Sequence, residues 1–352
     1  SVEFIVGGNN PVISLEKKLR NGYKSWTEDG VDVLMLGLWK YTQGNNFLRV
    51  LFWFQMLLKI LLLPNKLKRK PDIIIYSSLS LPGVFASLLI SKIYNVPHIF
   101  EVRDIWPMTL SKLKKLPPYH PVVFILSCFE WIGYKYSDAI VTSMPGGIDR
   151  VREVLSSDSK KVNWIPNGVT MARFTLQADR TKNSIVKVVY LGTIGIANSL
   201  ITLVKAAEAL AEYKSVCFEI YGDGPERVFL QDYIDKNNLI NIIFKGSVAQ
   251  LEVPSILNCA DILFHGSNDS ELYKFGISPN KLSEYMAAGR PILNSYSGGY
   301  DPVIEGDSGL SSKAGDIPAL VANIKTLAEN YDLRILLGKN ARQQAIYTYD
   351  YD

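Results

Sequence analysis

The sequence has little of what metal centres and disulfide frameworks are built from. In 352 residues there are three cysteines and three histidines: Cys128, Cys217, Cys259, His98, His120 and His265. An odd number of cysteines, each in apolar surroundings, predicts buried reduced thiols of a cytoplasmic protein and not a disulfide framework. The histidines lie far apart without metal-ligand spacing, so we expect structural histidines and no metal or cofactor.

Strong charge and long uninterrupted apolar runs are also missing. Charged residues make up 20% of the chain, and the net charge of +4 is compatible with anionic ligands or membrane lipid but does not decide between them. No nucleic-acid partner is expected. No signal peptide is expected at the N-terminus. The stretch from Phe47 to Leu63 is apolar, but Arg49, Gln55 and Lys59 interrupt it, which makes it marginal as a membrane-spanning helix. Two alternatives remain open, an interfacial helix on a membrane surface and a core helix with one polar edge.

A second basic and apolar patch follows, where Lys112, Lys114 and Lys115 precede the apolar run Val122–Phe129. Lysines next to apolar side chains favour the surface of an anionic membrane. We therefore expect a cytoplasmic protein that lies peripherally on the inner face of a membrane.

The pattern along the chain is an alternation of strands and helices, repeated twice. The first series has expected strands at Val2–Val6, Val31–Leu36, Ile73–Tyr76, His98–Val102 and Ala139–Thr142, and expected helices at Leu15–Trp26, Phe47–Leu63, Pro82–Tyr94 and Val123–Tyr136. The second has strands at Val186–Leu191, Val216–Tyr221, Ile242–Lys245, Ile262–Phe264 and Pro291–Leu293, and helices at Leu200–Tyr213, Glu226–Lys236, Val253–Cys259, Lys281–Ala288, Ile317–Asn330 and Leu333–Tyr347. Strands separated by helices predict parallel sheets covered on both faces.

This alternation gives the fold class: α/β, with two Rossmann-like doubly wound domains facing across a cleft. The turn residues Pro166-Asn167-Gly168 and the polar stretch Thr175–Ser184 mark the boundary. We expect an N-terminal domain over 1–172 and a C-terminal domain over 184–340. Residues 341–352 are expected to form a helix that packs back toward the N-terminal domain.

The most informative segment is Gly276–Pro291, which indicates a loop that enters a helix. The start of a helix offers unpaired N–H groups and positive dipole to an anion, and Lys281 adds a full charge. Glu284 lies one turn later on the same helix face and is suited to accept hydrogen bonds from ribose hydroxyls. The alternative is an ordinary helix start with Ser278 as the N-cap and Pro279 as the first helical residue.

Polar or glycine-containing loops follow other predicted strands, where ligands bind in doubly wound sheets. Gly8 and Asn9 follow the first strand, and the fourth ends in Glu101-Val102-Arg103-Asp104-Ile105-Trp106-Pro107. In the second series Gly192-Thr193, Gly222-Asp223-Gly224 and Ser247-Val248 come directly after strands. Together with Lys281 and Glu284, the last three loops predict a cleft for a sugar nucleotide, although each loop alone is equally typical of a simple turn.

These residues resemble those of the GT-B glycosyltransferases of family 4 over almost the whole chain. The resemblance rests on Ile165–Val169, Gly222–Pro225, Glu284–Ile292 and Ser297–Gly299, with Glu305-Gly306 and Gly309-Leu310. Glu101–Pro107 and Gly276–Lys281 are similar to the subgroup that builds bacterial surface polysaccharides, including N-acetyl-L-fucosaminyltransferase-like members of O-antigen pathways.

The resemblance implies a metal-independent, retaining hexosyltransferase with a nucleotide-diphosphate sugar donor, expected to be UDP-linked, and a lipid-linked or glycan acceptor. It also implies that the N-terminal domain (1–172) binds the acceptor and the C-terminal domain (184–340) binds the nucleotide-sugar. Glu284 matches the family's ribose-binding glutamate, Ile277 and Ser278 lie where backbone N–H groups meet the diphosphate, and Lys281 would neutralise its charge. Gly276 and Asn280 are further donor-binding candidates. Glu101, Arg103 and Asp104 are the further catalytic candidates, and Gly8, Asn9 and Trp106 the acceptor-binding ones.

The chain departs from the family pattern in three places. Gly276 stands where the motif has its first glutamate, and Arg103 stands where many members have a histidine. Thr193 stands near a usual arginine, and no Arg or Lys occurs between Gly192 and Lys205. These departures keep two alternatives open, a nucleotide-sugar-binding scaffold that has lost catalysis and a GT-B-shaped sugar-nucleotide epimerase.

Overall fold

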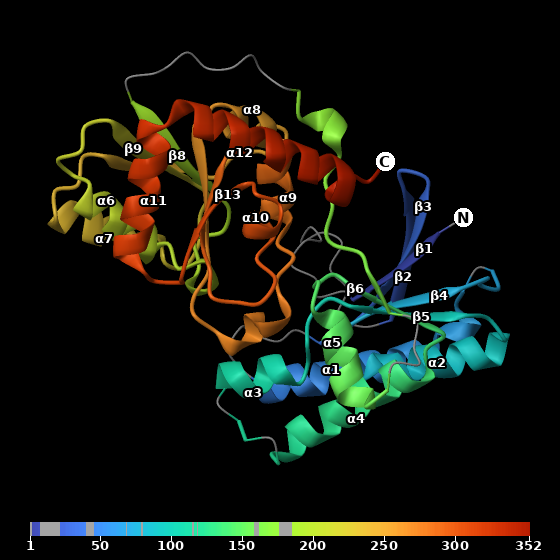
Figure 1. Cartoon of the computed structure of the whole chain (residues 1–352). Coiled ribbons are helices and arrows are strands. Elements are labelled where there is room, and N and C mark those ends of the chain that lie inside the picture. The colour runs from blue at the N-terminus through green and yellow to red at the C-terminus, as the bar shows by residue number, and fades with distance from the viewer. Residues whose placement is uncertain are drawn as a thin grey trace. The chain divides into compact units, whose positions relative to one another are not determined.

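The computed structural model describes residues 2–7, 22–39, 46–67, 69–78, 80–114, 116–117, 119–157, 162–175 and 185–352 (Figure 1). Contacts divide the chain into two compact units. The first comprises Ser1–Thr142 and Gly147–Trp164, and the second comprises Ser143–Gly146 and Ile165–Asp352.

The first unit contains two separate sheets. Strand β3 (Val31–Leu36) pairs in parallel with β1 (Glu3–Gly7) and antiparallel with β2 (Tyr23–Glu28). The other sheet is parallel, in the order β4 (Ile74–Ser77), β5 (His98–Val102), β6 (Ala139–Thr142) and β7 (Val162–Trp164). The helices of the first unit are α1 (Asn46–Leu61), α2 (Gly83–Tyr94), α3 (Met108–Lys114), α4 (Pro121–Tyr136) and α5 (Gly147–Leu155).

The helix predicted over Leu15–Trp26 is wrong at its C-terminal end. Residues 15–21 lie outside the described part of the chain, and Tyr23–Trp26 belong to β2. Asp29 and Gly30, with φ of 50° and 78°, form the tight turn that joins β2 to β3. An Asp-Gly pair between two strands is a strong hairpin signal, because both residues tolerate positive φ. That turn makes the β-conformation of Tyr23–Glu28 outweigh its helical pattern.

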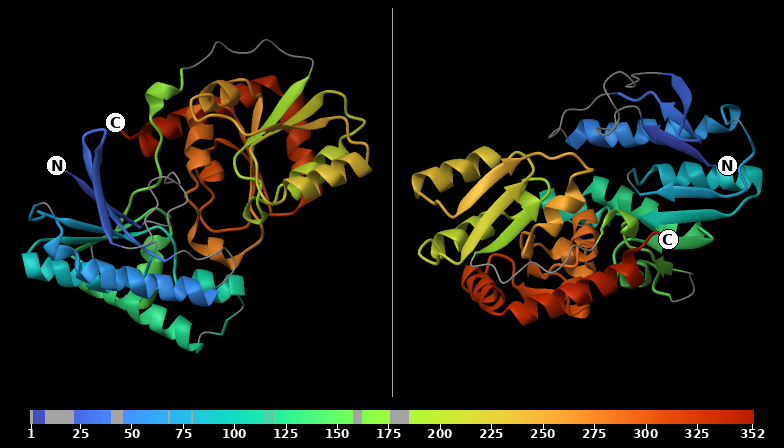
Figure 2. Two further views of the ribbon diagram at one scale, coloured as in Figure 1. Left: turned by 180° about the vertical axis from the view of Figure 1, so that it is seen from behind. Right: turned by 90° about the horizontal axis from the view of Figure 1, so that it is seen from above.

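Helices α1 and α2 pack against β3, and α4 packs against α2 (Figures 1 and 2). Alternate residues of β3, Leu34 and Leu36, are buried against Ile60 of α1 and Ile90 of α2. Across the described residues, no helix is long and apolar enough to cross a membrane.

The second unit is built on a six-stranded parallel sheet in the order β10-β9-β8-β11-β12-β13. Its strands are β8 (Val186–Leu191), β9 (Val216–Tyr221), β10 (Ile242–Gly246), β11 (Ile262–Gly266), β12 (Ile292–Ser295) and β13 (Gly309–Ser312). Its helices are α6 (Ile201–Ala209), α7 (Arg227–Lys236), α8 (Val253–Asn258), α9 (Asn280–Ala287), α10 (Pro302–Glu305), α11 (Ile317–Glu329) and α12 (Tyr331–Gln344). The order reverses between β8 and β11, and in open α/β sheets such a reversal, at the carboxyl ends of the strands, is where ligands bind.

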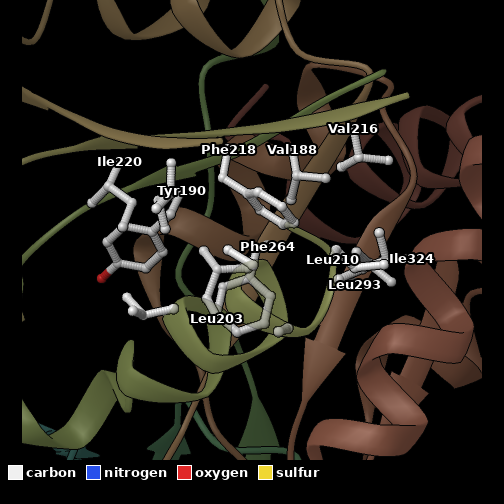
Figure 3. Packing of buried hydrophobic residues seen from close by; sticks show 14 of the residues in the cluster. Val188, Tyr190, Leu203, Leu210, Val216, Phe218, Ile220, Phe264, Leu293 and Ile324 are labelled. Atoms are coloured by element: carbon white, nitrogen blue, oxygen red, sulfur yellow. The ribbon is translucent and has the colours of Figure 1, made fainter. Parts of the chain in front are cut away.

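Helices cover both faces of this sheet, because its strands are apolar on both sides. On β8, Val186, Val188 and Tyr190 face the core shared with α6 and α11, which Figure 3 shows. The intervening Val189 and Leu191 face a second core shared with α8, α9 and α12. Successive strand residues point to opposite faces, so a continuous apolar strand predicts burial on both. The predicted doubly wound α/β class is confirmed in this unit.

The prediction of three buried cysteines is wrong for Cys128 and Cys259, which are exposed, and Cys217 is only half-buried. None of the three forms a disulfide bond. Cys128 lies on α4, whose apolar run includes the exposed side chains Phe124 and Ile125. An apolar neighbourhood in the sequence therefore did not mean a buried one.

Candidate functional site

In the first unit, the loop after β5 presents two charged residues to solvent. Arg103 and Asp104 are exposed, and Glu101 is half-buried at the end of the strand. The hydroxyl of Ser78, next to the end of β4, accepts hydrogen bonds from the backbone N–H of Arg103 at 2.9 Å and of Asp104 at 3.3 Å. The backbone of this loop is therefore fixed at the carboxyl edge of the sheet, as predicted for Glu101, Arg103 and Asp104.

Two predicted acceptor residues cannot be placed, and the third is buried. Gly8 and Asn9 lie outside the described residues. Trp106 packs edge-on against Trp53 of α1, with ring centroids 5.0 Å apart, and is only 6% exposed. The Trp106 indole ring therefore anchors the loop after β5 to α1.

In the second unit, the loops after β8, β9 and β10 are joined by backbone hydrogen bonds. The N–H of Gly192 donates to Tyr221 O at 3.0 Å, and that of Gly222 donates to Gly246 O at 2.8 Å. A Cβ at Gly222 would lie 1.9 Å from Gly192 O, and one at Gly224 would lie 2.2 Å from Ile194 O. The glycines predicted to admit a ligand are thus also needed for the loops to pack against each other.

The other predicted donor residues of these loops are near the surface. Thr193, Asp223 and Ser247 are exposed, whereas Val248 is partly buried against the core. Asp223 accepts a hydrogen bond from its neighbour Gly224 N at 2.8 Å and forms an ion pair with Arg227 at 3.7 Å. Its carboxylate thus stabilises the turn that it belongs to.

Lys281, in the first turn of α9, is the central cation of this site. Its Nζ donates to Tyr190 Oη at 3.1 Å and to Asn198 Oδ1, and it lies 4.8 Å from the centroid of the Tyr190 ring. Burial of the ammonium group lowers the pKa of Lys281 to about 8. Tyr190 is the penultimate residue of β8, and its hydroxyl points away from the other side chains labelled in Figure 3.

The start of α9 differs from the predicted Ser278–Pro279 cap. The helix begins at Asn280 with Pro279 in the cap position, so the proline supplies no side-chain cap. Ser278 instead contacts Asn167 of the Pro166-Asn167-Gly168 turn. Its hydroxyl accepts a hydrogen bond from Asn167 N at 2.9 Å, and its carbonyl accepts one from Asn167 Nδ2. No capping side chain therefore competes with an anion for the backbone N–H groups at the start of α9.

Gly276 has a backbone that only glycine adopts easily. Its φ is +83°, and a Cβ there would lie 2.7 Å from Pro145 Cγ. The first motif position is thus closed to any side chain, including the glutamate that the family pattern has there. Ile277 and Ser278 follow it directly and lead into α9.

Glu284 lies one turn after Lys281, as predicted. It is half-buried, and its Oε1 accepts from Gln250 Nε2 at 3.1 Å. Burial raises the pKa of Glu284, while the Gln250 hydrogen bond and the charge of Arg173 oppose the rise. Arg173 in turn donates to Gln250 O at 2.8 Å.

Several residues of the site had no signal in the sequence. Tyr190 of strand β8 and Asn198 contact Lys281, Gln250 contacts Glu284, and none of the three stood in a recognised motif. His265, at the end of β11, is buried with its Nδ1 2.8 Å from Asn294 Oδ1. Burial, followed by the charge of Lys281, lowers the pKa of His265 to about 3. Among the described residues, no group of three or more His, Cys, Asp or Glu side chains gathers as a metal site would require.

Comparison with known proteins finds a matching family profile and several similar proteins. Residues 175–344 match the profile of the family described as glycosyl transferases group 1. The chain is 23% identical to a glycogen synthase of Mycobacterium tuberculosis over 63% of its own length and 53% of the relative's. It is 25% identical to a sulfoquinovosyl transferase of Arabidopsis thaliana over 78% and 53%, respectively. The chain thus spans about half the length of these curated relatives.

Solved structures share the fold at low sequence identity. HepE of Anabaena, solved in complex with UDP, is 14% identical, with a TM-score of 0.66 over 91% of this chain and 82% of that one. A sucrose-phosphate synthase of Thermosynechococcus elongatus is 14% identical, with a TM-score of 0.72 over 100% and 96%. These likenesses show an α/β fold of the GT-B class.

Proposed function

We propose, from the match of residues 175–344 to the profile of the glycosyl transferases group 1 family, that this protein transfers a sugar from a UDP-linked donor to an acceptor. The observation that carries the proposal is Lys281, a largely buried cation at the first turn of α9 with Glu284 one turn later. An ammonium group at a helix N-terminus is suited to a diphosphate. Glu284 is the partner for ribose hydroxyls.

The chemistry follows from where charge develops. As the bond between the sugar and the diphosphate breaks, negative charge accumulates on the leaving nucleoside diphosphate. The Lys281 ammonium group and the N–H groups at Ile277, Ser278 and the start of α9 would stabilise it, because they are already oriented. With this charge supplied by protein groups, we propose a reaction that needs no metal ion.

The stereochemistry and the acceptor side of the reaction are also proposals. We infer retention of configuration, with the acceptor attacking from the face that the leaving group vacates and a donor phosphate oxygen taking its proton. Arg103 and Asp104, exposed at a strand edge of the first unit, are suited to position an acceptor, and Glu101 is a further candidate base.

The acceptor we propose is a lipid-linked sugar of bacterial surface polysaccharide synthesis, reached at the inner membrane surface. An apolar face supports this: Leu51 and Leu58 of α1 are 38% and 59% exposed, and Phe124 and Trp131 of α4 are 64% and 41% exposed. Phe54 and Phe129 join the two helices, with ring centroids 6.3 Å apart. Lys135 lies over the Trp131 ring at 6.0 Å and adds positive charge.

The earlier Lys112–Lys115 patch contributes less to this proposal. Lys112 is exposed on α3, while the Lys114 side chain and Lys115 lie outside the described residues.

Nucleotide binding is the first test. UDP, GDP, ADP and dTDP are each added to the protein, and the unfolding midpoint is measured. We expect UDP to raise the unfolding midpoint, because a ligand of the folded state stabilises that state by mass action.

Lys281→Met should lose the shift of the midpoint, whereas Lys325→Met should keep it. Lys325 is a matched control, because it also lies over a tyrosine ring, that of Tyr213 at 5.6 Å. The absence of a shift with all four nucleotides would contradict the proposal.

Membrane association is tested separately by flotation with vesicles that contain anionic phospholipid. Leu58→Glu together with Phe124→Glu should reduce the bound fraction, because charge is costly at the acyl boundary. Ile240→Glu is the control, since Ile240 is 89% exposed but lies in the second unit. If the wild type, the Leu58→Glu and Phe124→Glu double variant and Ile240→Glu all float to the same extent, the apolar face of α1 and α4 does not bind the membrane.

A nucleotide-sugar-binding scaffold is the second candidate. Gly276 in the first motif position and the absence of Arg and Lys from 193 to 204 favour it. Donor hydrolysis distinguishes the two, since a transferase slowly releases UDP from its donor without acceptor. A scaffold binds the nucleotide and releases none.

A further inference from the structure

The loop that follows β8 has no cation of its own, and Lys281 contacts it from α9. Between Gly192 and Lys205 the sequence contains no Arg or Lys. The Lys281 ammonium group nevertheless lies at this loop, bonded to Tyr190 at its start and to Asn198 within it. A residue that is distant in the sequence thus provides the positive charge.

The hydrogen-bond directions around Lys281 are fixed by one carbonyl oxygen, that of Thr193. Tyr190 Oη donates to Thr193 O at 2.7 Å, and Asn198 Nδ2 donates to the same oxygen at 2.9 Å. Because a carbonyl only accepts, Tyr190 must use its single proton there and Asn198 must turn its amide nitrogen toward it. Both residues are left with an oxygen lone pair for Lys281.

The loop itself is held in place by further backbone contacts. Asn198 ends a short 3-10 turn, Ile196–Asn198, in which its N–H donates to Gly195 O at 2.9 Å. The N–H of Asn268, after β11, donates to Ala197 O at 3.1 Å. Asn198 is therefore placed by the end of a neighbouring strand and not by its own sequence neighbours alone.

We propose that Tyr190 and Asn198 are positioning residues that hold the Lys281 ammonium group for the diphosphate of the donor. This rests on the proposed function. An ammonium group has three N–H donors, and its hydrogen bonds to the described residues use two, which leaves one for a phosphate oxygen. The lowered pKa of Lys281 agrees with this geometry, because burial removes water from the ammonium group.

The test measures the titration of Lys281 and the affinity for UDP in the full-length protein. Lysine labelled with carbon-13 at Cε reports each pKa by NMR, with Lys281→Met assigning the signal. Asn198→Asp should raise the pKa of Lys281 by about one unit or more, because it places a carboxylate beside the ammonium group. Asn237→Asp is the charge-matched control, on an exposed residue at the end of α7, and it should leave the signal unchanged.

Affinity provides the second readout. Asn198→Ala and Tyr190→Phe should each weaken UDP binding about tenfold, because each removes one acceptor that orients the cation. Unchanged titration of Lys281 in Asn198→Asp, together with unchanged affinity in the other two variants, would overturn the proposal. If the wild-type protein binds no UDP, the proposed function fails, and the NMR titration alone still decides whether Asn198 holds Lys281.

Discussion

Lys281 makes donor binding depend on pH. In the free protein its pKa is about 8, below the ordinary 10.5. Below pH 8 the ammonium group is already charged, whereas above it the free protein is neutral at this position and must take up a proton to bind a diphosphate. We expect UDP affinity to be nearly constant from pH 7 to 8 and to fall by up to tenfold per unit above that. Calorimetry at several pH values measures this, and Lys281→Met should bind more weakly with no such dependence.

The backbone at Gly276 determines whether the first glutamate of the family motif can be introduced at this position. We expect Gly276→Glu to destabilise the fold and not to raise activity, because its backbone has φ of +83° and Pro145 lies 2.7 Å from the added Cβ. Gly315→Glu is the matched control, since Gly315 has φ of +77° with nothing within 4 Å of an added Cβ. It should show only the backbone cost, about 1–2 kcal/mol. Equal unfolding midpoints for the two variants would contradict the steric argument.

At the scale of elements, a buried ion pair joins α4 to α5 in the first unit. Arg150 Nη2 lies 2.7 Å from Glu130 Oε2 and Nε lies 3.0 Å from Oε1, while Tyr134 Oη also donates to Glu130. The Glu130 side chain is only 2% exposed. Such a bidentate pair with an added hydroxyl donor satisfies most of what the buried carboxylate needs.

Removal of one partner should therefore be costly. We expect Glu130→Gln to lower the free energy of unfolding by about 3 kcal/mol, because it removes the buried carboxylate that pairs with Arg150 through two hydrogen bonds. Glu153→Gln is the comparison: Glu153 is 45% exposed and lies 3.8 Å from the same guanidinium group, so its loss should cost less than about 1 kcal/mol. Urea titrations of both variants measure the difference, and similar midpoints would be inconsistent with a stabilising role for the pair.

At the scale of the whole molecule, each of the two units has its own hydrophobic core. We expect calorimetry to show two unfolding transitions, since units with separate cores can lose their structure separately. UDP should raise the midpoint of only one of them, because the proposed donor site lies within the second unit. A single transition that shifts as a whole with UDP would count against independent unfolding.

The strands of the second unit were predictable from the sequence because they are short and mostly apolar, with Lys187 in β8 and Glu219 in β9 as single charged residues. Val186–Leu191 and Val216–Tyr221 are found with the expected bounds. The strand Gly309–Ser312 was not predicted, since a glycine and two serines in four residues give no apolar pattern. Its place beside β12 comes from backbone pairing, which the sequence does not display.

The candidate site shows the same division between what is local and what is tertiary. The sequence by itself determined the doubly wound class, because strand and helix patterns alternate along the chain, and it set Lys281 and Glu284 one turn apart, because both lie in one helical segment. Only the tertiary structure brought Tyr190 and Asn198 to Lys281, fixed the backbone of Gly276, and exposed the apolar side chains of α1 and α4. Those features depend on contacts between residues far apart in the chain, and no local pattern encodes which distant segments will meet.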